Sequence, residues 1–196
     1  MKRMEPRLEI WLEVKNWSGP NGTGRLLSRR RVKCHSYVGN FIDLLYVQFA
    51  QSNQSITDTS GVSRSVGISQ YNLWAYAAAA DDTKGVLVGT GTAANDVAKY
   101  ALATKIAHGT GAGQLQYGAC GIGVPATVGQ KRQMTIARTF TNVSGASITV
   151  NEVGLVIQGL VSGSTYYFLV ERTLSTNAIA NTASATWTYT ISITTS

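Results

Sequence analysis

A strict alternation of small polar and large apolar residues near the end of the chain limits the possible folds most. In residues 186–193, TWTYTISI, Thr or Ser alternates with Trp187, Tyr189, Ile191 and Ile193. Successive side chains of a β-strand point to opposite faces of the sheet, so these four side chains share one face. A helix would scatter them around its axis. The pattern therefore predicts a strand with one buried face.

Short apolar or alternating runs, separated by clusters of Gly, Ser, Thr and Asn, recur from residue 52 onward. They cover residues 60–68, 73–80, 85–88, 114–117, 133–140, 147–158, 165–171 and 185–193. The run 73–80 stays ambiguous, because its alanines also suit a helix. Many short strands joined by turns predict a mainly β chain, folded as an antiparallel β-sandwich of jelly-roll or Ig-like type.

Two further strands are expected in the first 35 residues. Apolar residues alternate over 8–14, residues 18–24 are rich in turn formers, and 26–35 suits a returning strand. The length of 196 residues fits one domain with an appended arm. We therefore expect a basic N-terminal arm or hairpin over residues 1–35 and a β-sandwich body over residues 36–196.

One amphipathic helix and one short second helix complete the expected fold. Ser36 is a good N-cap for a helix over residues 37–51. Its inward side chains, at helical spacing, are Val38, Phe41, Ile42, Leu45 and Phe49. The second helix is expected over residues 96–106, with Val97, Leu102 and Ile106 facing inward.

The positive charge is concentrated at the N-terminus. The first 35 residues contain nine of the 17 Lys and Arg residues but only three of the ten Asp and Glu residues. The formal net charge of the chain is +7, so the remainder is nearly neutral. Such asymmetry indicates an interaction surface. The candidate assembly residues are Arg25, Arg29, Arg30, Arg31 and Lys33.

Three interpretations of this basic cluster remain open. An acidic neighbouring protein is favoured, a solvated face comes second, and nucleic acid comes third. Phosphate contacts are chemically suited to arginine. However, alternation along a strand divides the arginines between two faces, and Trp11, Trp17 and Tyr37 belong to no recognised nucleic-acid-binding module.

The stretch 85–96, GVLVGTGTAAND, resembles the glycine turn of a dinucleotide-binding βαβ unit. Such a unit requires an acidic residue about 20 positions after the first glycine. No Asp or Glu lies between Asp96 and Glu152, and no second βα unit follows. The glycines are therefore expected to turn a strand into the short helix, and no cofactor is expected.

The remaining chemical groups favour structural roles. His35 and His108 are the only histidines, and Cys120 has no activating base nearby in the sequence. Asp81 and Asp82 suit a turn. Glu152 and Glu171 are expected to pair with an arginine such as Arg138 or Arg172 rather than to act as an acid and base.

No metal site is expected either, because Cys34 and the adjacent His35 would point to opposite faces of a strand. No catalytic residues are assigned, and the chain is expected to be non-enzymatic. It has neither a signal-peptide pattern nor an apolar run long enough for a membrane helix, so assembly in a cytoplasm with free thiols is expected.

Residues 138–155, RTFTNVSGASITVNEVGL, and 167–172, YFLVER, resemble structural proteins of tailed phages and related viruses. The runs VGTG at 88–91 and WTYTI at 187–191 support this resemblance, which covers about residues 85–193. It implies a β-sandwich found in tail, fibre and head-accessory components, such as capsid decoration or tail accessory proteins.

The resemblance implies a non-enzymatic virion structural protein, assembled in the host cytoplasm as a homo-oligomer with other virion proteins. The alternative is a surface glycan or receptor-binding module with an aromatic platform. Its candidate residues are Trp74, Tyr76, Tyr166 and Tyr167. A small redox enzyme is a third hypothesis that rests on the glycine turn alone.

Overall fold

The computed structural model describes residues 7–34, 38–50, 52–69, 72–129 and 131–194. The chain is mainly β, and its paired strands are antiparallel. The elements are β1 (Arg7–Trp17), η1 (Pro20–Gly22), β2 (Leu26–Cys34), α1 (Gly39–Ala50), β3 (Gln54–Thr57), β4 (Ser63–Val66), β5 (Gly85–Gly89), β6 (Gln116–Ile122), β7 (Ala126–Val128), β8 (Lys131–Thr141), β9 (Ile148–Val161), β10 (Ser164–Ile179) and β11 (Ser184–Thr194).

These strands form two larger sheets and one hairpin. The six-stranded sheet has the order β2-β1-β11-β8-β6, with β7 also paired to β8. The three-stranded sheet has the order β10-β9-β5, and β3 pairs with β4. The N-terminal hairpin is an integral part of the larger sheet, because β1 pairs with β11 from Arg7↔Thr194 to Trp17↔Ser184.

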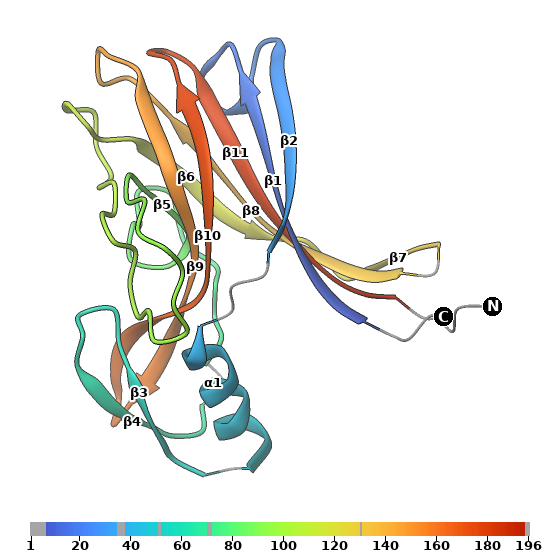
Figure 1. Ribbon diagram of the computed structural model, residues 1–196, viewed down its shortest axis with the longest axis vertical. Helices are drawn as coiled ribbons and strands as arrows, with labels where there is room; N and C mark the ends of the chain where they lie inside the picture. The colour runs from blue at the N-terminus through green and yellow to red at the C-terminus, as the bar shows by residue number, and fades with distance from the viewer. Residues whose placement is uncertain (1–6, 35–37, 51, 70–71, 130, 195–196) are drawn as a thin grey trace.

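The two larger sheets face each other and enclose the core (Figure 1). The alternation in β11 is confirmed, since Trp187 and Tyr189 are fully buried. Phe140 lies between Tyr117 and Trp187, with an edge-on ring contact to each. Across the interface, the Asn16 and Asn177 side chains exchange two hydrogen bonds of 2.7 and 2.8 Å.

Helix α1 confirms the first expected helix, and Val38 and Phe41 pack against the core as expected, but the rest of the buried face is shifted. Leu44 and Val47 are fully buried, whereas Ile42, expected inside, is 63% exposed. The sequence of α1 is apolar on several sides, so spacing alone does not select the inward face. Ser36, the expected N-cap, lies outside the described residues.

The prediction of a second helix over residues 96–106 is wrong. The segment is irregular, and an N–H of Ala98 donates to the Asp96 side chain at 2.9 Å. Thr90 N–H donates to Thr104 O and Ile106 N–H donates to Val88 O, so the segment hydrogen-bonds beside β5 instead. A helix would need these backbone groups for its own i to i−4 bonds. Val97, expected inside, is 68% exposed.

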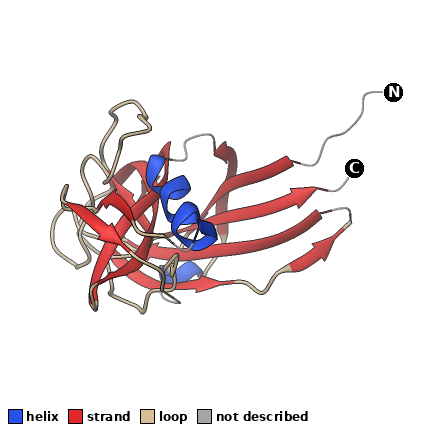
Figure 2. Ribbon diagram, turned by 90° about the horizontal axis from the view of Figure 1, so that it is seen from below, coloured by secondary structure: helices blue, strands red, loops and turns tan. Residues whose placement is uncertain are grey.

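Part of the six-stranded sheet extends beyond the smaller sheet. Figures 1 and 2 show β7 and the adjoining ends of β8, β11 and β1 running out on one side of the molecule. We call this extension the wing; it comprises residues 7–10, 124–129, 131–134 and 191–194. Val124 and Val128 are 88% and 58% exposed there. The wing therefore presents apolar side chains and the open edge of β7 to its surroundings.

Candidate assembly surface

Four of the five predicted basic residues lie on β2, an edge strand of the six-stranded sheet. Lys33 is opposite Trp11, Arg31 opposite Glu13, and Arg29 opposite Lys15. Arg29, Arg31 and Lys33 therefore share the outer face of the sheet, as the alternation predicts. We call this group, with its partners Glu9, Trp11, Glu13 and Lys15 on β1, the basic edge.

The other two predicted residues lie elsewhere. Arg30 is on the opposite face of β2, where its Nη1 donates to Thr176 O at 3.3 Å. Arg25 is exposed in the loop before β2, where its backbone N–H donates to Ser18 Oγ. The structure thus brings together three of the five candidates, and alternation separates Arg30 from them.

Ion pairs within the basic edge use both of its carboxylates. Glu13 Oε2 contacts Arg29 Nη2 at 2.5 Å, and Glu9 Oε1 contacts Lys33 Nζ at 2.8 Å. The hydrogen bond from Lys33 lowers the pKa of Glu9. Burial opposes ionisation of Glu13, but hydrogen bonds from Arg29 and Lys15 outweigh it and lower the pKa of Glu13 as well.

Arg31 remains without a carboxylate partner among the described residues, and its guanidinium lies 4.5 Å from the Trp11 ring centre. Sequence reasoning missed Glu9, Trp11 and Glu13 as members of this surface. The register of the β1–β2 hairpin brings them there, and alternation in both strands would have indicated it.

Away from the basic edge, the outer face carries mainly hydroxyl side chains, with Lys131 of β8 as a further cation opposite Thr194. Threonines occupy it on β11 and β8, including Thr186, Thr188, Thr190, Thr135 and Thr139. Thr139 and Thr186 share a hydrogen bond of 2.8 Å between their hydroxyls. Helix α1 packs against β3 and β10, so it does not cover this face. The outer face is therefore a threonine surface with positive charge along one edge.

The expected ion pair of Glu152 is confirmed, with Arg172 as its partner. Arg172 Nε lies 2.7 Å from Glu152 Oε2, and both side chains are almost fully buried. Burial opposes ionisation, but N–H groups of Thr104 and Ala103, together with Arg172, keep the pKa of Glu152 below its usual value.

This carboxylate also explains the glycines of the VGTG run. Gly91 N–H donates to Glu152 Oε1 at 3.1 Å. A Cβ atom on either Gly89 or Gly91 would lie 2.5 Å from that oxygen. The glycine turn therefore lets the backbone approach a buried carboxylate of its own chain.

The expected ion pair of Glu171 is not found among the described residues, because its side chain lies in the core between the sheets. It is fully buried, accepts a hydrogen bond from the Thr173 hydroxyl, and lies beside Tyr189 and Cys34. Burial raises its pKa to about 7. Its second oxygen, Oε2, has no hydrogen-bond partner among the described residues.

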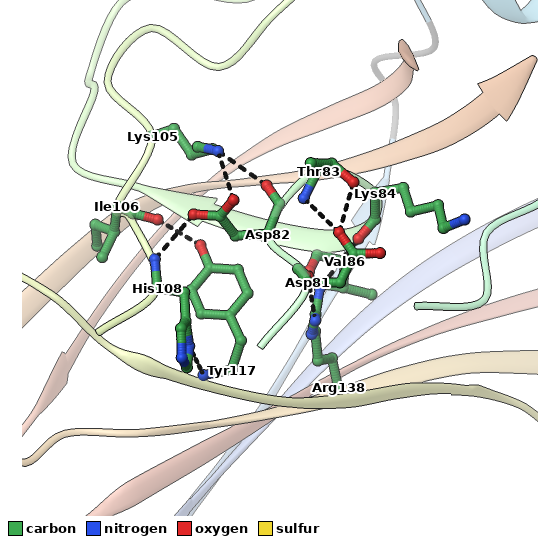
Figure 3. Close-up of polar contacts among 10 residues, drawn as sticks. All are labelled: Asp81, Asp82, Thr83, Lys84, Val86, Lys105, Ile106, His108, Tyr117 and Arg138. Carbon is green, nitrogen blue, oxygen red and sulfur yellow. Dashed lines mark hydrogen bonds and ion pairs between the residues drawn. The ribbon is translucent and has the colours of Figure 1, made fainter. Parts of the chain in front are cut away.

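Arg138 is buried too, but it binds backbone carbonyls and not a carboxylate. Its three nitrogens donate to the carbonyls of Ala78, Asp81, Lys84, Val86 and Gly118. Figure 3 shows this guanidinium below the turn formed by residues 81–84. Arg138 thus ties the loop before β5 to the six-stranded sheet.

The two aspartates of that turn have different roles. Asp81 accepts the N–H and hydroxyl of Thr83, which confirms the expected turn role. Asp82 forms an ion pair with Lys105 at 3.2 Å and accepts the N–H of His108 at 2.9 Å (Figure 3). Lys105 and His108 thereby fix residues 105–108 to the turn.

His108 and Cys120, for which structural roles are expected, have structural contacts. His108 Nδ1 accepts the N–H of Tyr117 at 3.0 Å. Cys120 is fully buried, as expected, and its Sγ accepts the N–H of Val86. Burial raises the pKa of both Cys120 and Cys34, and both thiols are free. A protonated, buried thiol is a poor nucleophile.

Within the described ranges, no group of three His, Cys, Asp or Glu side chains is placed to hold a metal ion. His35 lies outside them. No helix in the described part of the chain is long and apolar enough to cross a membrane.

Comparisons with known protein families, with curated proteins and with solved structures found no match. Function is therefore inferred from geometry and chemistry.

Proposed function

We propose that this chain is a non-enzymatic structural protein of a virus particle of the tailed-phage or a related type. In this role it assembles with copies of itself and with neighbouring capsid or tail proteins. The observation that carries the proposal is the wing, where Val124 and Val128 are exposed and the edge strand β7 extends beyond the smaller sheet (Figure 1). An open edge favours pairing with another chain, and a closed oligomer covers such edges.

Three further features support an assembly role. The facing sheets suit a β-sandwich of jelly-roll or Ig-like type, and the run 138–155 resembles phage structural proteins. The basic edge has two positive charges in excess, because Lys15 and Arg29 share Glu13 and Arg31 has no carboxylate partner among the described residues. Copies of this chain offer few acids to match it, because Asp58, Asp82 and Glu152 are already paired. The basic edge therefore fits an acidic neighbour of a different sequence.

Replacing Val128 in the wing with Glu tests self-assembly. We expect the wild-type chain to sediment as an oligomer, and Val128→Glu to weaken association at least tenfold. Burying a carboxylate in place of a methyl-bearing side chain costs more than about 1.4 kcal/mol. Sedimentation velocity over a concentration series measures this. Val62→Glu is the matched control, because Val62 is 45% exposed in the β3–β4 turn, outside the wing. A wild-type monomer that is also absent from purified particles would refute the proposal.

Reversing the charge of Arg31 tests the contact with the acidic neighbour. When wild-type and Arg31→Glu chains are co-expressed during particle assembly, we expect the variant to be incorporated about tenfold less. That ratio corresponds to about 1.4 kcal/mol for a lost, partly desolvated ion pair. Lys99→Glu, which makes the same charge change in the loop before residue 105, is the control. Equal incorporation of both variants contradicts the role of the basic edge. Salt-sensitive DNA binding that Arg31→Glu abolishes would identify nucleic acid as the partner instead.

A further inference from the structure

A pocket of about 290 Å³ opens on the side of the three-stranded sheet that faces away from the larger sheet. Its floor consists of Leu87 from β5 and Val156 from β9, both almost fully buried. Leu102 and Tyr167 form its walls. Asp82 and Lys105 also line it, with threonines 59 and 83. The pocket therefore combines an apolar floor, one aromatic ring and a few polar groups, as small-molecule sites do.

The Leu102 wall of the pocket is held in place by contacts with β9. The N–H groups of Ala103 and Thr104 donate to Glu152, which fixes the backbone next to Leu102. Leu102 is pressed against Gly154, where an added Cβ would lie 2.8 Å from Leu102 Cδ2. A preformed wall lowers the entropic cost of binding a ligand.

The polar groups are also oriented. Figure 3 shows Lys105 and Asp82 pointing toward each other, and Lys105 Nζ additionally donates to Asp82 O at 2.9 Å. The ammonium group uses two of its three N–H donors in these contacts, so one remains for a ligand. The carboxylate retains acceptor capacity, since each of its oxygens has one partner in the structure. A hydrogen bond from His108 and the charge of Lys105 outweigh burial and lower the pKa of Asp82, which keeps it ionised at neutral pH.

We infer that this pocket binds one neutral sugar ring, with the apolar face of the ring against Tyr167 and the floor and its hydroxyls on Asp82 and Lys105. The paired charges cancel, which disfavours a charged ligand. A hydroxyl can both donate to the carboxylate and accept from the ammonium group. The volume lies at the lower end of the range for ligand sites, about 300 Å³, which suits a single ring.

Of the four aromatic residues considered for a glycan platform, only Tyr167 lines this pocket. The ring of Trp74 is covered by the Lys84 ammonium at 4.1 Å, and the ring of Tyr166 by the Arg64 guanidinium at 4.0 Å. Tyr76 is 45% exposed and does not line the pocket. The inferred site is thus a pocket for one ring, and it does not depend on the proposed assembly role.

Saturation-transfer NMR with the full chain tests the inference, using free neutral hexoses and N-acetylhexosamines as probes. We expect at least one of them to bind, and Tyr167→Leu and Lys105→Met each to weaken binding at least fivefold. Tyr76→Leu is the matched control and should bind as the wild type does. Circular dichroism of each variant confirms that it is folded. Asp82→Asn provides a second test if Tyr167→Leu does not fold, and we expect the same loss.

The source of the sugar follows from a second arm of the experiment. Binding to an array of glycans with neutral terminal sugars is compared with binding to the free sugars. This comparison shows whether the ligand is a terminal residue of a surface glycan or a free monosaccharide. Both results support the site. No saturation transfer from any neutral sugar at tens of millimolar, equal binding by the wild type and the pocket variants, or preference for a charged sugar would each overturn the inference.

Discussion

Replacing Arg138 with Met is expected to lower the free energy of unfolding by about 5 kcal/mol. Arg138 is 1% exposed, and its guanidinium donates to five backbone carbonyls from three segments of the chain. A buried acceptor that loses its donor costs about 1 to 3 kcal/mol, and relaxation of the loop recovers only part of that sum. The free energy of unfolding of a domain is about 5 to 15 kcal/mol, so this single substitution removes a large part of it.

Urea unfolding, followed by tryptophan fluorescence, to which the buried Trp187 contributes, measures this effect. Arg138→Lys should lose about half as much, because an ammonium group has three donors and lacks the planar fork of arginine. Arg132→Met is the control on the exposed wing and should change stability by less than about 0.5 kcal/mol. A loss below about 1 kcal/mol in Arg138→Met would show that the carbonyls do not depend on the guanidinium.

Glu171 should make the protein less stable as the pH rises. Its pKa is about 7 in the folded state, and a carboxyl in an unfolded chain has a pKa of about 4.3. The folded state therefore binds this proton more tightly. The stabilisation from this protonated carboxyl group is complete below about pH 4 and is lost as the pH rises through 7. A tenfold difference in proton affinity corresponds to about 1.4 kcal/mol, so we expect a loss on the order of 2 to 3 kcal/mol between pH 5 and pH 8.5.

The Glu171→Gln variant isolates this contribution. Glutamine is neutral at every pH and retains an oxygen that can accept from Thr173, so the difference between the two proteins should shrink from pH 8.5 to pH 5. Carboxylates whose pKa values are lowered, such as Glu152 and Asp82, destabilise the fold at low pH when they become protonated. This effect is the same in both proteins, so it cancels when their free energies of unfolding are compared at each pH. Parallel stability curves for the two proteins would contradict a neutral, buried Glu171.

Much of the strand content follows from the sequence alone. The alternation in β1, β8 and β11 is readable because each of these strands has one buried and one exposed face. The same rule places Arg29, Arg31 and Lys33 on a common face. In contrast, β9 is buried on both faces, so apolar runs alone underestimate its length.

The features that sequence could not supply depend on contacts between distant segments. Residues 96–106 have a helix-compatible composition, but the carboxylate of Glu152, about 48 positions away, takes the N–H groups of Ala103 and Thr104. The wing depends on how far one sheet extends past the other. The sugar pocket depends on where residues 101–105 pass over the smaller sheet. None of these is encoded in a local pattern.

The pairing of β1 with β11 has a consequence for how the protein is made. Among the described residues these are the first and last strands, and their contacts join residues that are far apart in the sequence, such as Arg7 and Thr194. During synthesis on the ribosome, the β1–β2 hairpin emerges before β11, so the edge of β1 that pairs with β11 has no partner until β11 has been translated. High contact order of this kind slows folding and prolongs the exposure of an unpaired edge. In that interval, β11 of a second nascent chain can take the vacant place, which makes strand exchange between copies an expected hazard at high expression.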